Sequence, residues 1–378
     1  MKIVIAPDSF KGSATSRMAA RAMGEGVHKI FPEAELVEIP VADGGEGTVE
    51  ALTDSMHGEV VKKMVKGPLG DAVEAVYGLL PDKTAVIEMA SASGLPLVPE
   101  DKRNPLAAST FGTGQLIDDA LARGCETILL GIGGSATNDG GTGMAKALGY
   151  KFLDSNGNTL PEGGGALTDL ADIDDAEVNS LVFRAKFLVA CDVTNPLTGP
   201  EGASHIYGAQ KGASAEDIEL LDSALEKLAA VVSRKFGRSN KNFPGAGAAG
   251  GLGYGLMEFC GGELKPGIEI VLDLVKFDDY LDNADLVISG EGRIDGQSVY
   301  GKVPVGIAGR AKKKGIPVLA IVGDIGPKVE AVYDHGIDAI MTSVNKAMSL
   351  EEAMSRSYEL LVDSAARAMR MIRIGMGM

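Results

Sequence analysis

Cysteine is scarce in this sequence, and the little that is present forms no metal-binding or disulfide pattern. The three cysteines, Cys125, Cys191 and Cys260, lie far apart in a chain of 378 residues. Cysteine-based metal sites need closely spaced pairs, and a disulfide framework needs an even number of cysteines in a short secreted chain. We therefore expect neither. Cys125 and Cys191 lie in or beside apolar runs and are interpreted as buried small hydrophobic residues.

Long apolar runs are missing too. A membrane-spanning helix is recognised from about 18 or more consecutive apolar residues, and no such run occurs. The N-terminus enters a strand at residues 2–6 and lacks the longer apolar core and the cleavage site of a secretory signal. The sequence therefore predicts a cytoplasmic protein without a membrane partner.

Basic residues are outnumbered by acidic ones. Lys and Arg total 36 and Asp and Glu total 52, which gives a formal net charge of −16. Nucleic acids and anionic membranes bind to basic surfaces, so neither is expected as a partner. A small anionic substrate requires only a local basic cluster and is compatible with this charge. The 45% hydrophobic and 23% charged residues are typical of a globular protein, and the length suits roughly two or three domains.

Three common catalytic or binding signatures are absent. The four histidines have no Gly-x-Ser-x-Gly partner, so a hydrolase triad is not indicated. The most glycine-rich stretch is not followed by Lys and Ser or Thr, as a P-loop would be. Nor is it a proper Gly-x-Gly-x-x-Gly dinucleotide fingerprint with an acid about 20 residues on, and no such fingerprint follows the first strand. A nicotinamide dehydrogenase is therefore the weakest of the alternatives.

That glycine-rich stretch, residues 131–144 (GIGGSATNDGGTGM), is the strongest feature that is present. A short apolar strand is expected before it at 127–130, and a helix after it from residue 144. Between a strand and a helix, glycines let backbone N–H groups converge on an anion at the positive end of the helix. The stretch therefore predicts a phosphate cradle. The alternative is a tight strand-to-helix crossover that binds nothing.

The order of expected elements indicates an α/β fold. Strand, loop and helix alternate near both ends of the chain, as in a parallel sheet, whereas alternating apolar residues at 59–66 and 72–80 predict a hairpin. The sequence predicts two domains: residues 1–56 and 284–378 form a flavodoxin-like five-stranded parallel sheet, and residues 57–283 form an inserted α/β domain with a mixed sheet. The five parallel strands are expected at residues 2–6, 35–39, 286–289, 318–322 and 339–342.

Acidic, glycine-rich loops follow several of these strands, where open α/β sheets bind ligands. Their carboxylates suit Mg²⁺ that is held by one or two protein oxygens together with substrate phosphates. An Asp at a strand end is also often a helix cap or a turn residue, so each loop has a purely structural alternative. The loops are residues 7–12, 42–47, 190–196 and 290–297.

Together with the glycine-rich stretch, these loops resemble the bacterial type I family of glycerate kinases. The resemblance extends over nearly the full chain, in the family's order. It rests on residues 5–12 (IAPDSFKG), 40–48 (PVADGGEGT), 131–141 (GIGGSATNDGG), 191–197 (CDVTNPL) and 290–295 (GEGRID).

The resemblance implies an ATP-dependent phosphotransferase that acts on an alcohol group of D-glycerate. The product would be 2-phosphoglycerate, with 3-phosphoglycerate as the other outcome. ATP and Mg²⁺ are the implied cofactors, and the protein would be a monomer or a homodimer. A non-catalytic regulator of the same fold that binds a nucleotide or metabolite is the alternative from a different class. The number of acids in the loops favours catalysis, because a sensor needs no base.

The chemistry of phosphoryl transfer assigns catalytic roles to matched positions. Lys11 and Arg293 are the cations for the substrate carboxylate or the moving phosphoryl group. Of Asp192 and Asp295, one is expected to hold Mg²⁺ and the other to accept the hydroxyl proton, and the sequence does not say which. Glu291 is a third candidate metal ligand.

The remaining matched positions are assigned to binding. For the substrate they are Asp8, Asp43 and Asn195. For the ATP phosphates they are Gly133, Gly134, Ser135 and Asn138.

Overall fold

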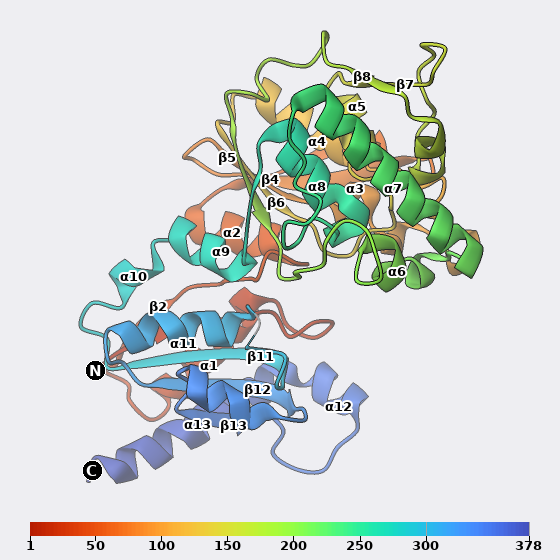
Figure 1. The fold of residues 1–378 in the computed structure, drawn as a ribbon. Coiled ribbons are helices and arrows are strands. Elements are labelled where there is room, and N and C mark those ends of the chain that lie inside the picture. Colours follow the sequence, from red (N-terminus) through yellow and green to blue (C-terminus); the bar gives the residue numbers. More distant parts are fainter. Residues whose placement is uncertain (300, 378) are drawn as a thin grey trace. The chain divides into compact units, whose positions relative to one another are not determined.

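In the computed structural model, which describes residues 1–299 and 301–377, the chain divides into two units by its internal contacts (Figure 1). Unit 1 contains residues 1–43, residues 50–57 and the chain from Pro266 onward, and unit 2 contains residues 44–49 and 58–265. Each unit has its own main sheet, a parallel one in unit 1 and a mixed one in unit 2.

Unit 1 is built on a five-stranded parallel sheet in the order β13-β12-β11-β1-β2. Counted within this unit, the order is 2-1-3-4-5, which confirms the expected flavodoxin-like arrangement. Its switch point lies at β1, which pairs with β2 on one side and with β11 on the other. The strands are β1 (Lys2–Ile5), β2 (Glu35–Glu38), β11 (Leu286–Ile294), β12 (Val318–Ile325) and β13 (Ala339–Thr342).

Helices cover both faces of this sheet. Figure 1 shows α1 and α13 on one side and α11 on the other. The first pair packs on the buried side chains of Ile3, Ile5 and Ile288, so these alternate strand positions face one core. Thr15 caps α1 by accepting a hydrogen bond from the N–H of Met18 at 3.3 Å. The helices are α1 (Ser16–His28), α2 (Thr48–Met56), α9 (Gly267–Leu274), α10 (Phe277–Tyr280), α11 (Val303–Lys313), α12 (Leu350–Ser355) and α13 (Ser357–Gly375).

The segment at 266–283 groups with unit 1, although the sequence analysis placed it in the inserted part. An ion-pair cluster around Arg310 of α11 is among the contacts that join it to this unit. Its guanidinium group lies 2.7 Å from Asp273 of α9 and 2.8 Å from Asp278 of α10, and it also pairs with Glu269. Apolar periodicity does not reveal such a charge cluster. The assignment of the units as domains stays a prediction.

Unit 2 is built on a six-stranded mixed sheet in the order β10-β9-β6-β5-β4-β3. The four strands from β10 to β5 pair in parallel, and β4 and β3 pair antiparallel, as the predicted hairpin requires. The strands are β3 (Glu59–Lys66), β4 (Ala72–Leu79), β5 (Thr84–Glu88), β6 (Thr127–Gly131), β9 (Lys186–Ala190) and β10 (Glu263–Lys265), and a separate ribbon is formed by β7 (Lys151–Leu153) and β8 (Asp172–Asp174).

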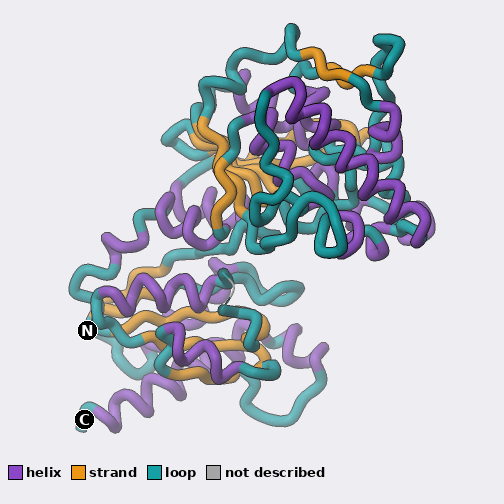
Figure 2. The backbone as a smooth tube through the Cα atoms, in the orientation of Figure 1, coloured by secondary structure: helices purple, strands orange, loops and turns teal. Residues whose placement is uncertain are grey.

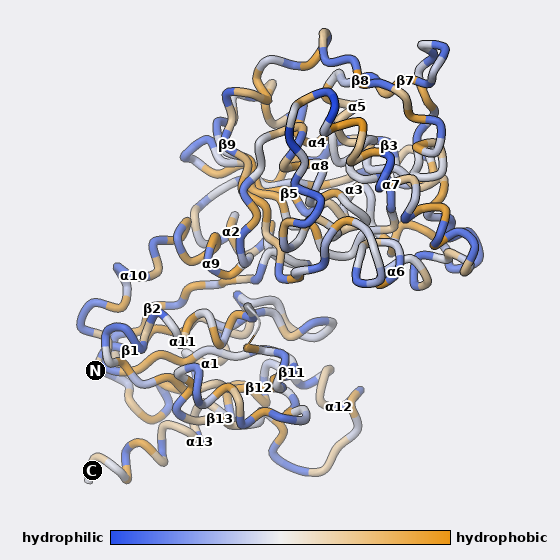
Figure 3. The backbone as a smooth tube through the Cα atoms, viewed as in Figure 1, coloured by the Kyte–Doolittle hydropathy of each residue, from blue (hydrophilic) through white to orange (hydrophobic). Residues whose placement is uncertain are grey.

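The helices of unit 2 pack against this sheet (Figure 2), and their buried side chains share one core with Ile87, Ile128 and Leu130 of the strands. The longest, α7, has both ends specified by its sequence: Ser214 and Asp217 form a capping box, and Gly237 ends it at φ +70°. Because the central strands are covered, they are near-continuous apolar runs, visible as orange segments in Figure 3. The helices are α3 (Ala90–Ser93), α4 (Phe111–Ala122), α5 (Thr142–Ala147), α6 (Ala203–Tyr207), α7 (Ala215–Phe236) and α8 (Ala248–Cys260).

No helix in the part of the chain that the structure describes combines the length and the hydropathy needed to cross a membrane. Cys125 and Cys260 are buried, as small hydrophobic residues are, whereas Cys191 is only half-buried.

Candidate active site

A cavity of about 650 Å³ lies at the carboxyl ends of β1, β11 and β12 in unit 1. This is the switch point of the sheet, where flavodoxin-like folds bind their ligands. The loop after β1 is held beside β11, because the N–H of Ala6 donates to the carbonyl oxygen of Ile288 and that of Asp8 to Gly290, both at 2.8 Å. The charged residues that line the cavity are Asp8, Lys11, Asp43, Glu291, Arg293, Lys302 and Asp324.

Asp8 is the most perturbed acid of this cavity. Its side chain is buried, and the backbone N–H of Ser9 donates to its Oδ1 at 2.7 Å. Burial is the main cause that raises its pKa to about 7, and the charges of Asp43 and Glu291 raise it further, whereas Lys11 lowers it in part. Asp8 therefore exchanges a proton near neutral pH.

Glu291 is the second buried acid. The hydroxyl of Ser298 donates to its Oε1 at 3.1 Å, and the ammonium group of Lys302 lies 3.3 Å from its Oε2. Burial still raises the pKa of Glu291, although Lys302 and Ser298 oppose the effect. Asp43, which the sequence analysis placed in the same site, is half-buried and close enough for its charge to act on both acids.

The basic groups lie nearer to solvent than these carboxylates. Lys11 is exposed, and the side chain of Arg293 is 58% exposed. The Nε of Arg293 lies 3.7 Å from Asp324 and 4.0 Å from Asp295. These distances are long for hydrogen bonds, so its N–H groups can still bind another anion. The cavity thus combines buried carboxylates with accessible cations.

The chemistry of the acids fits a divalent cation, although they are not arranged as a closed cage. Within residues 1–299 and 301–377, no three acidic, His or Cys side chains converge as metal ligands. Mg²⁺ commonly takes only one or two carboxylates and completes its shell with water and substrate phosphates. Burial is the main cause of the raised pKa of Asp8, and the negative charges of Asp43 and Glu291 add to it; a bound divalent cation would offset those charges.

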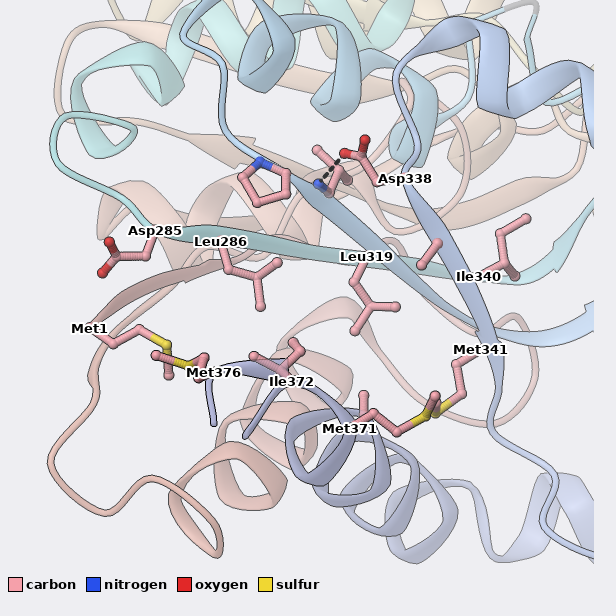
Figure 4. Close-up of a pocket in the computed structure, with 14 residues that line it drawn as sticks. Met1, Asp285, Leu286, Leu319, Asp338, Ile340, Met341, Met371, Ile372 and Met376 are labelled. Carbon is pink, nitrogen blue, oxygen red and sulfur yellow. Dashed lines mark hydrogen bonds between the residues drawn. The ribbon is translucent and has the colours of Figure 1, made fainter. Parts of the chain in front are cut away.

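A second cavity, of about 800 Å³, lies at the opposite edge of the same sheet, where the strands begin (Figure 4). Its wall is mostly apolar, and Figure 4 shows Met341, Met371 and Ile372 among the side chains that line it. Its two acids are engaged within the chain: Asp285 accepts the N–H of Lys2, and Asp338 accepts that of Val318, both at 2.8 Å. None of the described residues that line this cavity has a basic side chain for an organic acid.

The glycine-rich loop of unit 2 joins β6 to α5, as expected. Gly133 and Gly134 are exposed, and a Cβ built on Gly133 would meet no atom within 4 Å. Gly134 has φ +74°, a conformation that other residues rarely adopt. The backbone of these two glycines is therefore open to a ligand.

The other two predicted cradle residues are buried. Ser135 accepts a hydrogen bond from Nζ of Lys211 at 2.9 Å. Asn138 is fully buried and donates to the hydroxyl of Ser204 at 3.0 Å. The structure thus divides the predicted cradle into an exposed glycine pair and two side chains that point into unit 2.

Two residues near this loop were not singled out from the sequence. Asp139 is fully buried and accepts four hydrogen bonds, two from Thr110 and one each from the N–H groups of Gly141 and Gly143; burial nevertheless raises its pKa. Asp139 lies three residues before the first residue of α5, Thr142, and an acid just before an expected helix is a signal that could have found it. Lys211 is also buried, and no sequence signal distinguishes it from a surface lysine.

Asp192 and Asp295, the predicted base and metal ligand, lie in different units. Asp192 is exposed in the loop after β9. Asp295 accepts the N–H of Gln297 at 2.8 Å, the geometry of a turn residue, and is not among the residues that line the cavity of unit 1. Asn195 closes its own loop: it donates to Glu201 at 2.8 Å and accepts from Tyr207 at 2.7 Å.

Comparisons with known proteins agree along the whole chain. A model of the glycerate kinase family matches residues 3–373. A glycerate kinase of Halalkalibacterium halodurans is 53% identical over 364 residues, which are 96% of this chain and 96% of that protein. A glycerate 2-kinase of Escherichia coli is 48% identical over 377 residues, with 100% of this chain and 99% of that protein covered.

A solved structure is similar as well. The crystal structure of a candidate glycerate kinase 2 from Salmonella typhimurium LT2 superposes with a TM-score of 0.92 at 46% identity, and the match covers 100% of both chains. This likeness confirms the expected fold class.

Proposed function

Because this chain belongs to the glycerate kinase family, we propose that it transfers the terminal phosphoryl group of ATP to D-glycerate and forms 2-phosphoglycerate. The 2-hydroxyl is favoured over the 3-hydroxyl because a relative that is 48% identical is named a glycerate 2-kinase. The single observation that carries the proposal is the cavity of unit 1, in which accessible cations accompany a group of buried carboxylates. Such a cavity suits a small substrate that has both a carboxylate and a reacting hydroxyl.

Lys11 and Arg293 bind the carboxylate of glycerate in this proposal. Both are accessible at the cavity, and the guanidinium group of Arg293 can donate two parallel hydrogen bonds to a carboxylate. Asp43 lies on the same wall and is placed to accept a hydrogen bond from a glycerate hydroxyl.

Asp8 accepts the proton of the reacting hydroxyl. A general base works best when its pKa lies near the operating pH, and burial with two neighbouring acids brings the pKa of Asp8 to about 7. Asp192 and Asp295 stay candidates for the base or for a metal ligand, but Asp295 has the hydrogen bonds of a turn residue. Measuring kcat for Asp8→Asn, Asp192→Asn and Asp295→Asn shows which of the three carboxylates acts as the base.

Glu291, with Asp43 or Asp8 beside it, holds Mg²⁺ in this proposal, because these acids line one cavity and the negative charge of Asp43 acts on both of the others. When bound, the ion neutralises charge on the transferred phosphoryl group. Lys302 keeps Glu291 in place through its 3.3 Å ion pair.

The phosphates of ATP bind at Gly133 and Gly134 of unit 2, with Ser135 beside them. Support comes from the exposure of the glycine backbone and the absence of any atom within 4 Å of a Cβ built on Gly133. Transfer requires the two substrates to meet, so we propose that the units act as two domains that approach each other when both substrates are bound. Limited proteolysis near residues 57 and 266, with and without ligands, tests this movement.

A coupled ATPase assay with D-glycerate and other hydroxy acids tests the activity, and phosphorus NMR of the product separates 2- from 3-phosphoglycerate. Glycerate-dependent turnover is expected in the presence of Mg²⁺. Binding of ATP without such turnover would instead favour the non-catalytic regulator. The type I subfamily, the cytoplasmic location and the monomeric or homodimeric state stay predictions of the sequence.

A further inference from the structure

A lysine lies buried directly behind the glycine-rich loop. Lys211 ends a short 3₁₀ helix, η4 (Ala209–Lys211), and only 2% of its surface is exposed. Its Nζ donates to the hydroxyl oxygen of Ser135 at 2.9 Å and to the carbonyl oxygen of Thr137 at 2.7 Å. Both bonds are made to the segment that follows the exposed Gly133 and Gly134, so Lys211 fixes the position of the loop from inside.

These bonds also determine what Ser135 can offer to a ligand. An ammonium group has only hydrogens to donate, so the Ser135 oxygen must accept from it. The Ser135 hydroxyl hydrogen is therefore directed elsewhere, and no acceptor for it occurs in the described parts of the chain. Ser135 keeps 7% of its surface exposed next to the two open glycines. It can thus donate a hydrogen bond to an anion that reaches the loop.

The loop is also short of partners for its own buried groups. The hydroxyl of Thr137 and the side-chain oxygen of Asn138 are buried and have no hydrogen-bond partner among the described residues. Buried polar groups are nearly always paired, so unpaired ones in a ligand loop indicate that the arrangement is completed by a bound molecule or water.

The charges that face Lys211 leave its positive charge only partly balanced. The acid that acts on it is Asp139, and this carboxylate already accepts four hydrogen bonds from other groups. Arg103, whose guanidinium donates to the carbonyl oxygen of Gln210 on η4, adds a second cation. On the neighbouring α6, His205 pairs with two acids of α7.

We infer that Lys211 is a positioning residue for phosphate binding: it orients Ser135 as a donor and supplies a positive charge behind the loop. This inference rests on the proposed binding of nucleotide phosphates to that loop. Burial lowers the pKa of Lys211 to about 7, whereas Asp139 raises it in part. The charge is therefore present below neutral pH and is lost above it, and an anion on the loop would favour the protonated form. Affinity for ATP should fall as the pH rises through about 7.

The test uses three variants of the full-length protein: Lys211→Met, Lys211→Gln and Ser135→Ala. KM for ATP, KM for D-glycerate and kcat are measured from about pH 6 to about pH 9, and ATP alone is used to record ligand-induced shifts in Tm. Lys211→Met should raise KM for ATP roughly tenfold or more at about pH 6, because charge-assisted hydrogen bonds are lost. Its KM should no longer depend on pH in this range, and KM for glycerate should stay unchanged. Lys211→Gln keeps donors without a charge and should recover only part of the affinity.

The results distinguish an error in the role of Lys211 from an error in the phosphate site or in the proposed function. If folded Lys211→Met keeps the wild-type KM for ATP and its pH profile, the inference is wrong and the lysine is only structural. If Gly133→Val also leaves KM for ATP unchanged, the placing of the phosphates at this loop is wrong. Absence of glycerate turnover in the wild type contradicts the proposed function itself, whereas the ATP-induced shift in Tm still tests Lys211.

Should Lys211→Met fail to fold, Ser135→Ala decides the question. It retains the lysine and removes the donor, so KM for ATP should rise. The matched control is Ser239→Ala, which removes a partly buried hydroxyl bonded to Tyr254 elsewhere in unit 2. An unchanged KM for ATP in Ser135→Ala would contradict the inference.

Discussion

Replacing Asp8 by Asn should stabilise the folded protein and abolish most of its activity. The pKa of Asp8 is raised from 3.8 to about 7 by burial and by the charges of Asp43 and Glu291. A tenfold change in a proton equilibrium is worth about 1.4 kcal/mol, so ionised Asp8 costs the fold on the order of 4 kcal/mol, shared with its neighbours. Asn has nearly the same shape and keeps an oxygen for the N–H of Ser9.

The stabilisation expected from Asp8→Asn depends on pH, because the pKa of Asp8 is higher in the folded state than in the unfolded state. Because the folded pKa is the higher one, the cost is absent below about pH 4, grows as the pH rises and is complete above about pH 7. Asp8→Asn should therefore exceed the wild type in the free energy of unfolding by a few kcal/mol at about pH 8, and by much less at about pH 5. Urea unfolding in EDTA measures both values.

The exposed Asp334, in the same unit, provides the control. Asp334→Asn should change the free energy of unfolding little at either pH. If Asp8→Asn is instead less stable than the wild type by the same amount at both pH values, Asp8 makes a favourable structural bond. In that case the argument from repulsion, and with it the support for a catalytic base, is refuted.

The remaining predictions concern both units. Gly133→Val should raise KM for ATP and leave KM for glycerate unchanged, while the exposed helical Gly309→Val, which likewise meets no atom within 4 Å, should affect neither; steady-state kinetics with circular dichroism of both variants checks this. Arg293→Met should raise KM for glycerate roughly tenfold or more, because a bidentate pair is lost, with KM for ATP as the internal control. Glu291→Gln should require more Mg²⁺ for half-maximal turnover, and a titration in which its kcat is not recovered at any Mg²⁺ concentration would exclude a ligand role. Burial of the Lys211 charge costs stability below about pH 7, and this cost is relieved towards pH 10.5, so Lys211→Met should gain more in Tm over the wild type at about pH 6 than at about pH 9.

The fold was largely predictable because its strands and helices are specified locally. The alternation at 59–66 and 72–80 gave the hairpin of β3 and β4, and the apolar strands near both ends gave the five-stranded sheet with its order. The place of α9 and α10 could not be derived in this way. Among the contacts that fix it are the ion pairs of Arg310 with Asp278 and Asp273, which lie 32 and 37 residues away in the sequence. Hydrophobic periodicity carries no information on such pairs.

The candidate site was predicted in part. The loops at strand ends singled out Asp8, Lys11, Glu291 and Arg293, and the structure brings these four residues to one cavity; their roles stay predictions. Lys211 was missed, since a lysine beside a glycine is normally a solvated loop residue and only the three-dimensional contacts show its burial.

The burial of Asn138 in the glycine-rich loop was not predictable from the sequence either. A loop sequence indicates that N–H groups can converge on an anion, but whether a particular side chain faces the ligand or the core depends on packing. Asn138 is fully buried against Ser204, so the structure favours the glycine backbone over this amide as the contact surface.

The most direct test of the account is the rate of phosphoryl transfer from ATP to D-glycerate by the wild type and by Asp8→Asn across pH, with the product identified by phosphorus NMR. The wild type should form 2-phosphoglycerate, and its kcat should fall below about pH 7 as Asp8 becomes protonated. Asp8→Asn should lose ~10²–10⁴-fold in kcat and lack this pH dependence, because a general base contributes about that much. The proposed function is contradicted if the wild type does not phosphorylate D-glycerate. The role of Asp8 as the base is contradicted if folded Asp8→Asn retains the kcat of the wild type and its pH profile.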